Sequence, residues 1–525
     1  MKNLRASTRT ERNSFIEKHQ DIIAGVLSCF DRIIFKGYLM SLSYPEGVTM
    51  FLARQGVLLK DWKQFVKARS EEMKEHAKSM AKEQGRLFLP LKGRKASKDK
   101  DDRARRIAKR EGITEGLICV LSVVEQCQSF KLQYGEGRPR LVSDSPRCLC
   151  LYYYFMDPVF GLIHVRVQTW FPFVVQVYTN GHEWLAREMT RAGIGYEQAD
   201  NTFVRIDDFG AAQELADRLG PQGRVRHLNR LARLVNPLMG GLLKGLRYYW
   251  VTDQCEYATD VVFDSPADLK SLYEKLLPHA IVSFGAEDVM TFLGRKLHGN
   301  FQGEIKTTLN RREPGARIKH RMKGNWIKMY NKHGRVLRIE TVINHPYEFK
   351  VWRRGKRKGE VVMGYLPMAK RVSNLPHYAE KSLSSNLRYL EALTAVENPS
   401  RAYELLDKLC HPVTQNGNRL RALNPLRREE LAMFAVAMRG EYCLRGFRND
   451  DLRKGLGLER PADAAGRKRV SSRVGRLIRL LRGHGLLKRI PRTRSYRPTL
   501  RGLTMMAAAL SLYNFDLLAQ VQQRL

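Results

Sequence analysis

The stretch IKHRMKGNWIKMYNKHGRVLRIETVIN, residues 318–344, alternates charged and apolar side chains. Successive side chains of a β-strand point to opposite faces, so this pattern predicts two strands joined by a tight turn. A two-residue turn at His333 and Gly334 would place Met329 on one face with Arg338, which mixes core and solvent. We therefore expect a three-residue loop that starts at Lys332, with Gly334 in the left-handed conformation.

That register predicts one apolar and one polar face for the hairpin. Tyr330 pairs with Val336, and Lys328 pairs with Arg338. The apolar face consists of Ile327, Met329, Leu337 and Ile339, and the polar face of Lys328, Tyr330, Arg338 and Glu340. Two interpretations of Glu340 remain open. It is either half of a surface ion pair worth under about 1 kcal/mol, or a ligand for a divalent cation beside a phosphodiester.

A metal site of that kind needs more than one carboxylate, because the hard cations Mg²⁺ and Mn²⁺ prefer oxygen ligands. The segment RYYWVTDQCEYATDVVF, residues 247–263, is predicted as a strand, and Glu256 and Asp260 share one of its faces. We expect Glu340, Glu256 and Asp260 to bind Mg²⁺ or Mn²⁺ as a catalytic set. Tyr330 is then a nucleophile or a stacking group.

Two further aspartates are weaker catalytic candidates. Asp31 lies in CFDRIIFKG, and Asp157 lies in the turn MDPVFG. Because Asp157 precedes Pro158, turn chemistry explains it equally well. In the rival enzyme class, an RNase-H-like transposase or nuclease, one of the two would be the acid on the first strand.

The charge of the chain indicates its partner. Its 525 residues include 92 Lys and Arg against 53 Asp and Glu, a formal net charge of +39. Such an excess repels itself unless a polyanion is near, so we expect DNA as the partner and RNA as a second candidate. The N-terminus lacks an apolar signal core, and no apolar run approaches the roughly 20 residues of a membrane span. The expectation is a cytoplasmic protein with no membrane partner.

The eight cysteines fit the reduced core thiols of such a protein. No CxxC pair occurs, and Cys148 and Cys150 project from the same face of one predicted strand. Zinc is therefore not expected.

Changes of hydrophobic period divide the chain into four regions of an α+β protein. Residues 1–115 are predicted as a basic helical region, and residues 116–365 as a central antiparallel sheet region with packed helices. That central region carries the expected catalytic and nucleic-acid-binding groups. Residues 366–425 are predicted as a helical connector, and residues 426–525 as a DNA-binding domain.

The central region offers a polar strand face for nucleic acid. The strand GLIHVRVQTW, residues 161–170, points His164, Arg166 and Gln168 to one side. Three tyrosines, Tyr152, Tyr153 and Tyr154, stand on the preceding strand. Such a face either clamps single-stranded nucleic acid or packs a core. Further phosphate contacts are expected from the hairpin, through Lys319, Arg321, Lys328, Lys332 and Arg338.

The last hundred residues carry a clearer pattern. REELAMFAVAMRG and FRNDDLRKGLG are predicted as two helices, the second capped by Asn449. In the third, GRKRVSSRVGRLIRLLRGHG, an apolar stripe of Val470, Val474, Leu477, Ile478 and Leu481 is expected to be buried. The outward side is Arg467, Lys468, Arg469, Ser472, Arg473 and Arg476.

Two strands joined by a basic turn follow in GLLKRIPRTRSYRPTLRG, with Arg492 and Arg494 in the turn. This order resembles the winged-helix domains of MarR-type bacterial DNA-binding proteins. The resemblance covers roughly residues 426–520. It implies that the third helix enters the major groove and that the wing touches the DNA backbone.

The hairpin segment IKMYNKHGRVLRIETVI resembles a K-x-Y-x-K…R-x-E pattern near the active site of rolling-circle replication initiators and related strand-transfer enzymes. The resemblance implies a ferredoxin-like catalytic sheet, a divalent metal and a tyrosine that attacks phosphate. His164, in IHVRVQ, departs from the paired histidines of those families. As a whole, the chain resembles an uncharacterised family of bacterial proteins with phrases such as HVRVQTWFPF and RIETVIN, which implies no activity.

These observations favour a nucleic-acid-binding protein that cleaves DNA or transfers its strands with a divalent metal, as in a mobile element or a replication initiator. The alternative is a non-catalytic regulator, in which the winged helix reads DNA and the central sheet binds RNA or an effector. Convergence of Glu256, Asp260 and Glu340 favours the enzyme, and scattered acids favour the regulator.

Overall fold

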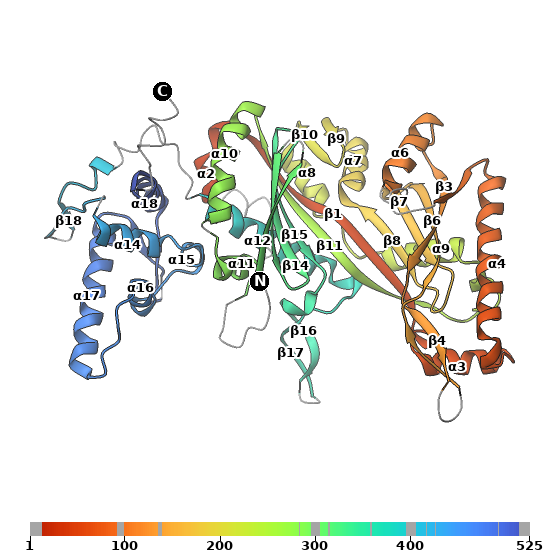
Figure 1. Ribbon diagram of the computed structural model, residues 1–525. Helices are drawn as coiled ribbons and strands as arrows, with labels where there is room; N and C mark the ends of the chain where they lie inside the picture. Colours follow the sequence, from red (N-terminus) through yellow and green to blue (C-terminus); the bar gives the residue numbers. More distant parts are fainter. Residues whose placement is uncertain are drawn as a thin grey trace, which may run out of the picture. The chain divides into compact units, whose positions relative to one another are not determined.

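The computed structural model describes residues 13–91, 99–134, 139–282, 284–295, 305–312, 315–357, 360–394, 406–415, 417–425, 427–491 and 493–513 (Figure 1). The chain forms two compact units. One comprises Met1–Leu27, Thr259–Thr341 and Ser382–Leu525, and the other comprises Ser28–Ala258 and Val342–Lys381.

Eleven strands form one mixed sheet in the order β12-β13-β14-β15-β11-β1-β8-β7-β6-β3-β2. The edge strand β2 runs parallel to its neighbour β3. β12 to β14 and the series β1, β8, β7, β6 and β3 pair antiparallel. Their bounds are β1 Ile23–Leu39, β2 Leu87–Leu91, β3 Gly116–Gln126, β6 Arg147–Asp157, β7 Gly161–Gln168, β8 Val175–Asn180, β11 Tyr248–Phe263, β12 Ile305–Arg312, β13 Gly315–Met322, β14 Asn325–Lys332 and β15 Val336–Ile343.

The remaining strands form two-stranded ladders. These are β4 Ser129–Gln133 with β5 Arg140–Asp144, β9 Tyr196–Ala199 with β10 Thr202–Ile206, β16 Lys350–Arg357 with β17 Glu360–Pro367, β18 Val413–Gln415 with β19 Asn418–Leu420, and β20 Leu487–Arg489 with β21 Tyr496–Pro498. The α-helices are α2 Ser14–Lys18, α3 Pro45–Arg54, α4 Trp62–Glu83, α6 Lys100–Arg110, α7 Gly181–Arg191, α8 Phe209–Ala216, α9 Arg224–Val235, α10 Pro266–Val282, α11 Ala286–Phe292, α12 Leu375–Leu393, α14 Arg428–Ala437, α15 Gly440–Arg445, α16 Asn449–Gly455, α17 Ala464–Gly483 and α18 Leu500–Tyr513.

The prediction of an entirely helical region 1–115 is wrong at β1 and β2. β1 lies between β11 and β8, well inside the sheet. Its sequence, IAGVLSCFDRIIFKGYL, is rich in Ile, Phe and other residues that favour a pleated, buried surface. Helices α3, α4 and α6 do follow, so the helical pattern was correct only outside these two strands.

In the predicted sheet region, the strand expected at residues 161–170 is confirmed as β7 and the tyrosine-bearing strand before it as β6. Alternation along β7 is also as expected, since Ile163, Val165 and Val167 are fully buried. The neighbouring tyrosines divide between the two faces. Tyr153 pairs with Val165 on the apolar side, whereas Tyr152 and Tyr154 pair with Arg166 and His164.

The stretch 318–344 contains three strands, β13, β14 and β15, and not two, because a further turn at Lys323 and Gly324 separates β13 from β14. The hairpin of β14 and β15 has the predicted faces but a different turn. Its apolar face is buried, at Ile327, Met329, Leu337 and Ile339. Both His333 and Gly334 adopt positive φ angles, of 51° and 73°. The N–H of Arg335 donates to the carbonyl of Lys332 at 3.1 Å, so the turn closes across these two left-handed residues. The prediction assigned that conformation to Gly334 alone.

Residues 366–425 are more than a connector. In α12, Asn386 is fully buried and hydrogen-bonds Thr259 of β11 and Thr341 of β15. Further on, Leu406, Leu409 and Leu423 belong to the same buried cluster as Phe434, Ile478 and Met506. The core of the C-terminal segment therefore begins about 20 residues before the predicted boundary at 426.

Within that segment, helices α14 to α17 precede the ladder β20–β21, and α18 closes it. Val474, Ile478 and Leu481 of the expected stripe are buried, and Val470 and Leu477 are half-buried. Asn449 is the first residue of α16 and not its cap, which is Arg448, and the Nδ2 of Asn449 donates to the carbonyl of Ser471 at 2.9 Å. The Asp451 carboxylate instead accepts from the N–H of Arg448 at 2.8 Å.

Candidate functional site: an acidic cluster and basic surfaces

Three buried carboxylates come together on neighbouring strands of the sheet. Asp31 lies on β1, Glu256 on β11 and Glu340 on β15, and these strands are adjacent in the order β15-β11-β1. One oxygen from each of the three acids lies within 4.8 Å of the others. Their exposed fractions are 5%, 5% and 1%. Three carboxylates at this separation form a donor set that suits a hard divalent cation.

The cluster contains Glu256 and Glu340, two of the three predicted metal ligands, but Asp31 stands in place of the third. Asp260 does not join it, because both its oxygens accept from Arg338, at 2.6 Å from Nε and 2.6 Å from Nη2. Arg338 is fully buried in this pair. Asp260 is therefore a structural counter-ion, and Arg338 does not present its guanidinium to a phosphate. Asp31, the weaker candidate, takes the predicted place of Asp260.

Glu340 also bonds to the polar face of the hairpin. Its two oxygens accept hydrogen bonds from the ammonium of Lys328 and the hydroxyl of Tyr330. The predicted polar face thus forms, and Tyr330 lies directly against one acid of the cluster.

Asp31 and its neighbour Arg32 have further polar contacts. Asn201 donates to Asp31 Oδ1 at 2.8 Å, and His182 Nδ1 lies 3.5 Å from the same oxygen. Burial by itself would lower the pKa of Arg32, but the charge of Glu256, with smaller contributions that include Asp31, raises that pKa above its ordinary value. Arg32 therefore remains a cation next to two acids of the cluster.

Asp157 has a structural role. Its Oδ1 accepts from the N–H groups of Val159 and Phe160, at 2.9 and 3.0 Å, and Oδ2 lies 2.9 Å from His227 Nε2. Although burial acts to raise the pKa of Asp157, the hydrogen bond from His227 and these backbone donors bring it below its usual value. These contacts agree with the turn interpretation, and Asp157 is not in the acidic cluster.

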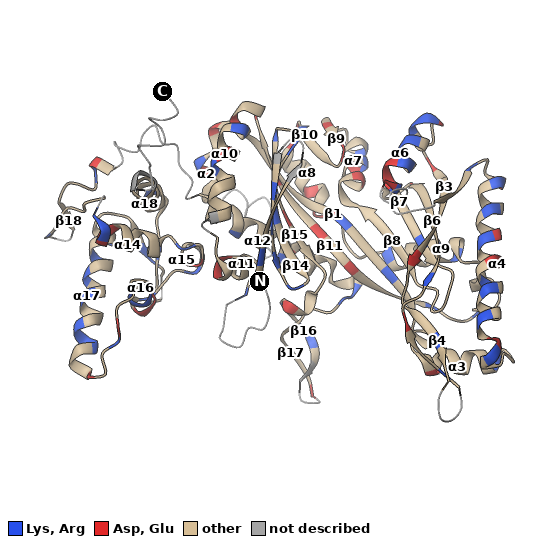
Figure 2. Ribbon diagram, viewed as in Figure 1, with Lys and Arg blue, Asp and Glu red and all other residues tan. Residues whose placement is uncertain are grey.

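A basic face covers β12, β13 and β14. Cross-strand pairing places Lys306 opposite Arg321, and Lys319 opposite Lys328. Arg317 lies opposite Tyr330, so it shares this face. Lys319 also stacks its ammonium 3.9 Å from the ring centre of Trp326. Figure 2 marks the lysines and arginines of these strands in blue. Of the predicted hairpin cations, Arg321 is exposed, and Lys319, Lys328 and Lys332 are half-buried.

The predicted β7 face lines a cavity of about 500 Å³, together with Tyr152 and Tyr154. Its charges are already paired. Arg166 Nε donates to Glu125 at 3.1 Å, and His164 Nδ1 lies 3.4 Å from Asp101. The amide of Gln168 donates to three backbone carbonyls. The charges of Arg166 and His164 are therefore directed at neighbouring acids, and this face is not a row of unpaired cations.

The outward side of α17 is exposed as predicted, at Arg467, Lys468, Arg469, Ser472, Arg473 and Arg476. Arg494, near the β20–β21 turn, is exposed too, whereas Arg492 lies outside the described residues.

The basic patch WRRGKRKG, residues 352–359, is visible in the sequence, and its described part lies on the ladder β16–β17. Trp352 and Tyr365 are 56% and 63% exposed, with ring centres 5.2 Å apart. Register places Arg354 opposite Met363 on the same face. Alternating aromatic and basic side chains on an exposed strand were the available signal.

Among the described residues, no helix combines the length and apolar character needed to cross a membrane. Comparison of the chain with protein-family models, with curated proteins and with solved structures finds no match.

Proposed function

We propose that this protein is a divalent-metal-dependent enzyme that cleaves nucleic acid or transfers its strands, with DNA as the first candidate substrate. The convergence of Asp31, Glu256 and Glu340 carries the proposal, because a hard cation needs several oxygen ligands at one point. When bound, Mg²⁺ or Mn²⁺ would polarise a phosphate and lower the pKa of a water molecule.

The basic surfaces support a polyanionic substrate. Lys306, Arg317 and Arg321 share one strand face in the region that also carries Glu340. Separately, α17 presents five arginines and a lysine to solvent, with Arg479 beyond the predicted set. Under this proposal the C-terminal segment is a winged helix that positions duplex DNA, and the strand face holds the backbone near the acids.

The test is a cleavage assay on single-stranded DNA, duplex DNA and RNA, with Mg²⁺, Mn²⁺ or EDTA. Wild-type protein is expected to cut or join at least one of these in a metal-dependent manner. Asp31→Asn, Glu256→Gln and Glu340→Gln each remove a charged ligand at nearly constant volume and should each abolish the reaction. The matched control is Glu71→Gln, since the Glu71 side chain is 63% exposed on α4. Equal activity of all four variants would exclude the cluster as the reaction centre.

Tyr330→Phe separates two mechanisms. A tyrosine nucleophile leaves a covalent protein–DNA adduct, which the phenylalanine variant cannot form. An attacking water leaves no adduct, and the variant then loses only the hydrogen bond to Glu340. The adduct is detected by denaturing electrophoresis with labelled DNA.

One observation favours the regulator as the second candidate. Glu340 is 1% exposed and already satisfied by Lys328 and Tyr330, and Glu256 accepts from Gln254 at 2.6 Å. The acids therefore have partners without a metal. If no divalent metal supports cleavage and Glu340→Gln alters only thermal stability, DNA binding without catalysis replaces the enzyme proposal.

A further inference from the structure

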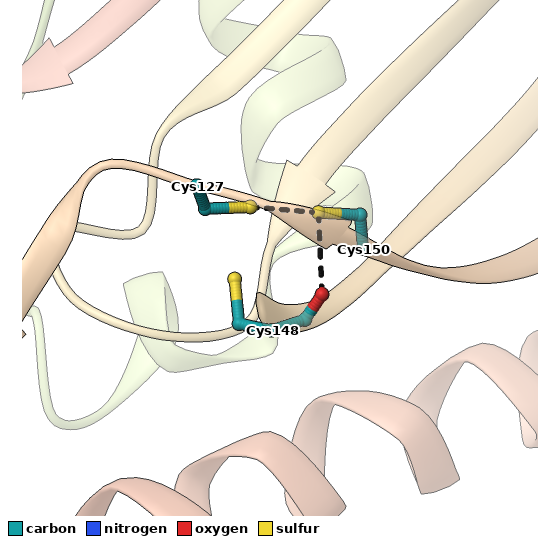
Figure 3. A group of neighbouring side chains, drawn as sticks. All are labelled: Cys127, Cys148 and Cys150. Atoms are coloured by element: carbon teal, nitrogen blue, oxygen red, sulfur yellow. Dashed lines mark hydrogen bonds between the residues drawn. The ribbon is translucent and has the colours of Figure 1, made fainter. Parts of the chain in front are cut away.

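Three cysteines converge in the part of the sheet formed by β3 and β6. Cys127 directly follows β3, and Cys148 and Cys150 lie on β6. Their sulfurs lie within 4.8 Å of one another, with Cys127 and Cys150 only 3.4 Å apart. Figure 3 shows the three side chains directed toward a common point. The exposed fractions are 5%, 2% and 0%, so the group is buried.

The pairing of the backbone explains how Cys127 meets Cys148 and Cys150, which follow it by 21 and 23 residues in the sequence. β3 and β6 pair antiparallel, with Glu125 opposite Cys148 and Gln126 opposite Arg147. The N–H of Cys127 donates to the carbonyl of Pro146 at 2.9 Å, which holds the residue after β3 beside the start of β6. Because alternate side chains share a strand face, Cys148 and Cys150 both point to Cys127. The same feature was taken from the sequence as a reason against zinc.

We propose that Cys127, Cys148 and Cys150 bind a thiophilic divalent metal ion, with zinc as the natural occupant. A tetrahedral zinc with Zn–S bonds of about 2.3 Å sets its sulfurs about 3.8 Å apart. The observed separations, from 3.4 Å to at most 4.8 Å, need only small side-chain movements to reach that value. A disulfide would employ two of the sulfurs and leave the convergence of the third unexplained.

Charge balance supports a metal with three thiolates. A divalent ion and three thiolates sum to one negative charge. Arg166 supplies the matching positive charge, since its Nη2 lies 3.0 Å from Cys150 Sγ and 3.3 Å from Cys127 Sγ. Glu125, which also contacts Arg166, has its own counter-ion in Lys100 at 2.8 Å. The loaded site would therefore be neutral without further change.

A fourth ligand could reach a metal ion at this site through the neighbouring cavity. Cys127 lines the 500 Å³ cavity together with Tyr152, Tyr154 and His164. Three protein ligands and one position open to a cavity are typical of zinc sites that exchange a water or a small ligand. The site lies on strands other than those that carry Asp31, Glu256 and Glu340.

The test measures metal on the full-length chain, purified without chelator and dialysed against zinc. One tightly held zinc per chain is expected by elemental analysis. Replacement with Co²⁺ should give the thiolate charge-transfer absorption of a sulfur-coordinated ion, which carboxylate ligands do not produce. Serine variants at 127, 148 and 150 should each weaken binding at least tenfold and remove this absorption. Cys119→Ser and Cys410→Ser, which alter cysteines outside the trio, are the controls.

Arg166→Gln gives a second measurement, with an expected loss of about tenfold in affinity because it removes the counter-charge next to the ligands. Should the serine variants fail to fold, the wild-type chain suffices: a chelator must lower its melting temperature, and zinc must restore it. The proposal is overturned if zinc is absent and Co²⁺ shows no thiolate absorption. It is also overturned if the chain binds no metal and mild oxidation forms a disulfide between Cys127 and Cys150.

Discussion

Asp260→Asn should destabilise the fold, because Asp260 is the counter-ion of Arg338. Asp260 and Arg338 are 2% and 0% exposed and form two hydrogen bonds of 2.6 Å. Removing the carboxylate charge leaves a buried guanidinium without its counter-ion, which costs about 3–5 kcal/mol. With a denaturant slope of about 3 kcal/mol/M, the urea midpoint of the affected transition should fall by roughly 1–1.7 M.

The assay is urea unfolding of the full chain, followed by fluorescence and circular dichroism. Replacing both partners, Arg338→Met with Asp260→Leu, should recover most of the loss, because an apolar pair of similar volume removes both buried charges. Asp31→Asn should show the opposite profile, with small effects on the midpoint and loss of cleavage. A midpoint for Asp260→Asn within about 0.3 M of wild type, combined with lost metal binding, would show that Asp260 is a ligand after all.

Three further outcomes are expected. Burial lowers the pKa of His19, His279 and His320 to about 4. As the pH falls below 6.5, these histidines take up protons in the unfolded chain but stay neutral in the folded chain until the pH approaches about 4. Each histidine therefore destabilises the fold by up to about 2 kcal/mol at pH 5 relative to pH 7, and His320→Gln should reduce this difference in urea titrations. DNA affinity should fall steeply between about 50 and 200 mM salt, and a flat response would contradict a phosphate-binding surface. Arg473→Ala with Arg476→Ala should cost about 1–3 kcal/mol per lost base contact in gel-shift assays. Arg494→Ala should weaken all DNA sequences alike, and unchanged binding in both cases would exclude α17 as the DNA-reading helix.

The sequence was sufficient to predict the elements whose apolar side chains recur with the period of a single strand or a single helix. Alternation in residues 318–344 predicts both faces of the hairpin, and the same rule predicts β7 with its buried and polar sides. The 3.6-residue period of α17 likewise separates Val474, Ile478 and Leu481 from the exposed arginines. These features depend on the geometry of one strand or one helix, which neighbouring residues determine.

The position of β1 needed the tertiary structure. Residues 23–39 stand between helical segments in the chain, yet they lie between β11 and β8 in the sheet. Pairing of strands more than 100 residues apart leaves no periodic trace in either strand. Asp31 was therefore visible as an acid in the sequence, but its place beside Glu256 and Glu340 was not.

Only the packed structure distinguishes a metal ligand from an ion-pair partner. Glu256 and Asp260 share one face of β11 and look equivalent in the sequence, but Asp260 meets Arg338, whereas Glu256 meets two other acids. The same holds for the cysteines, since Cys127 reaches Cys148 and Cys150 only through the pairing of β3 with β6. A site is a set of distances between distant segments, and these distances arise from strand pairing and side-chain packing that no single segment encodes.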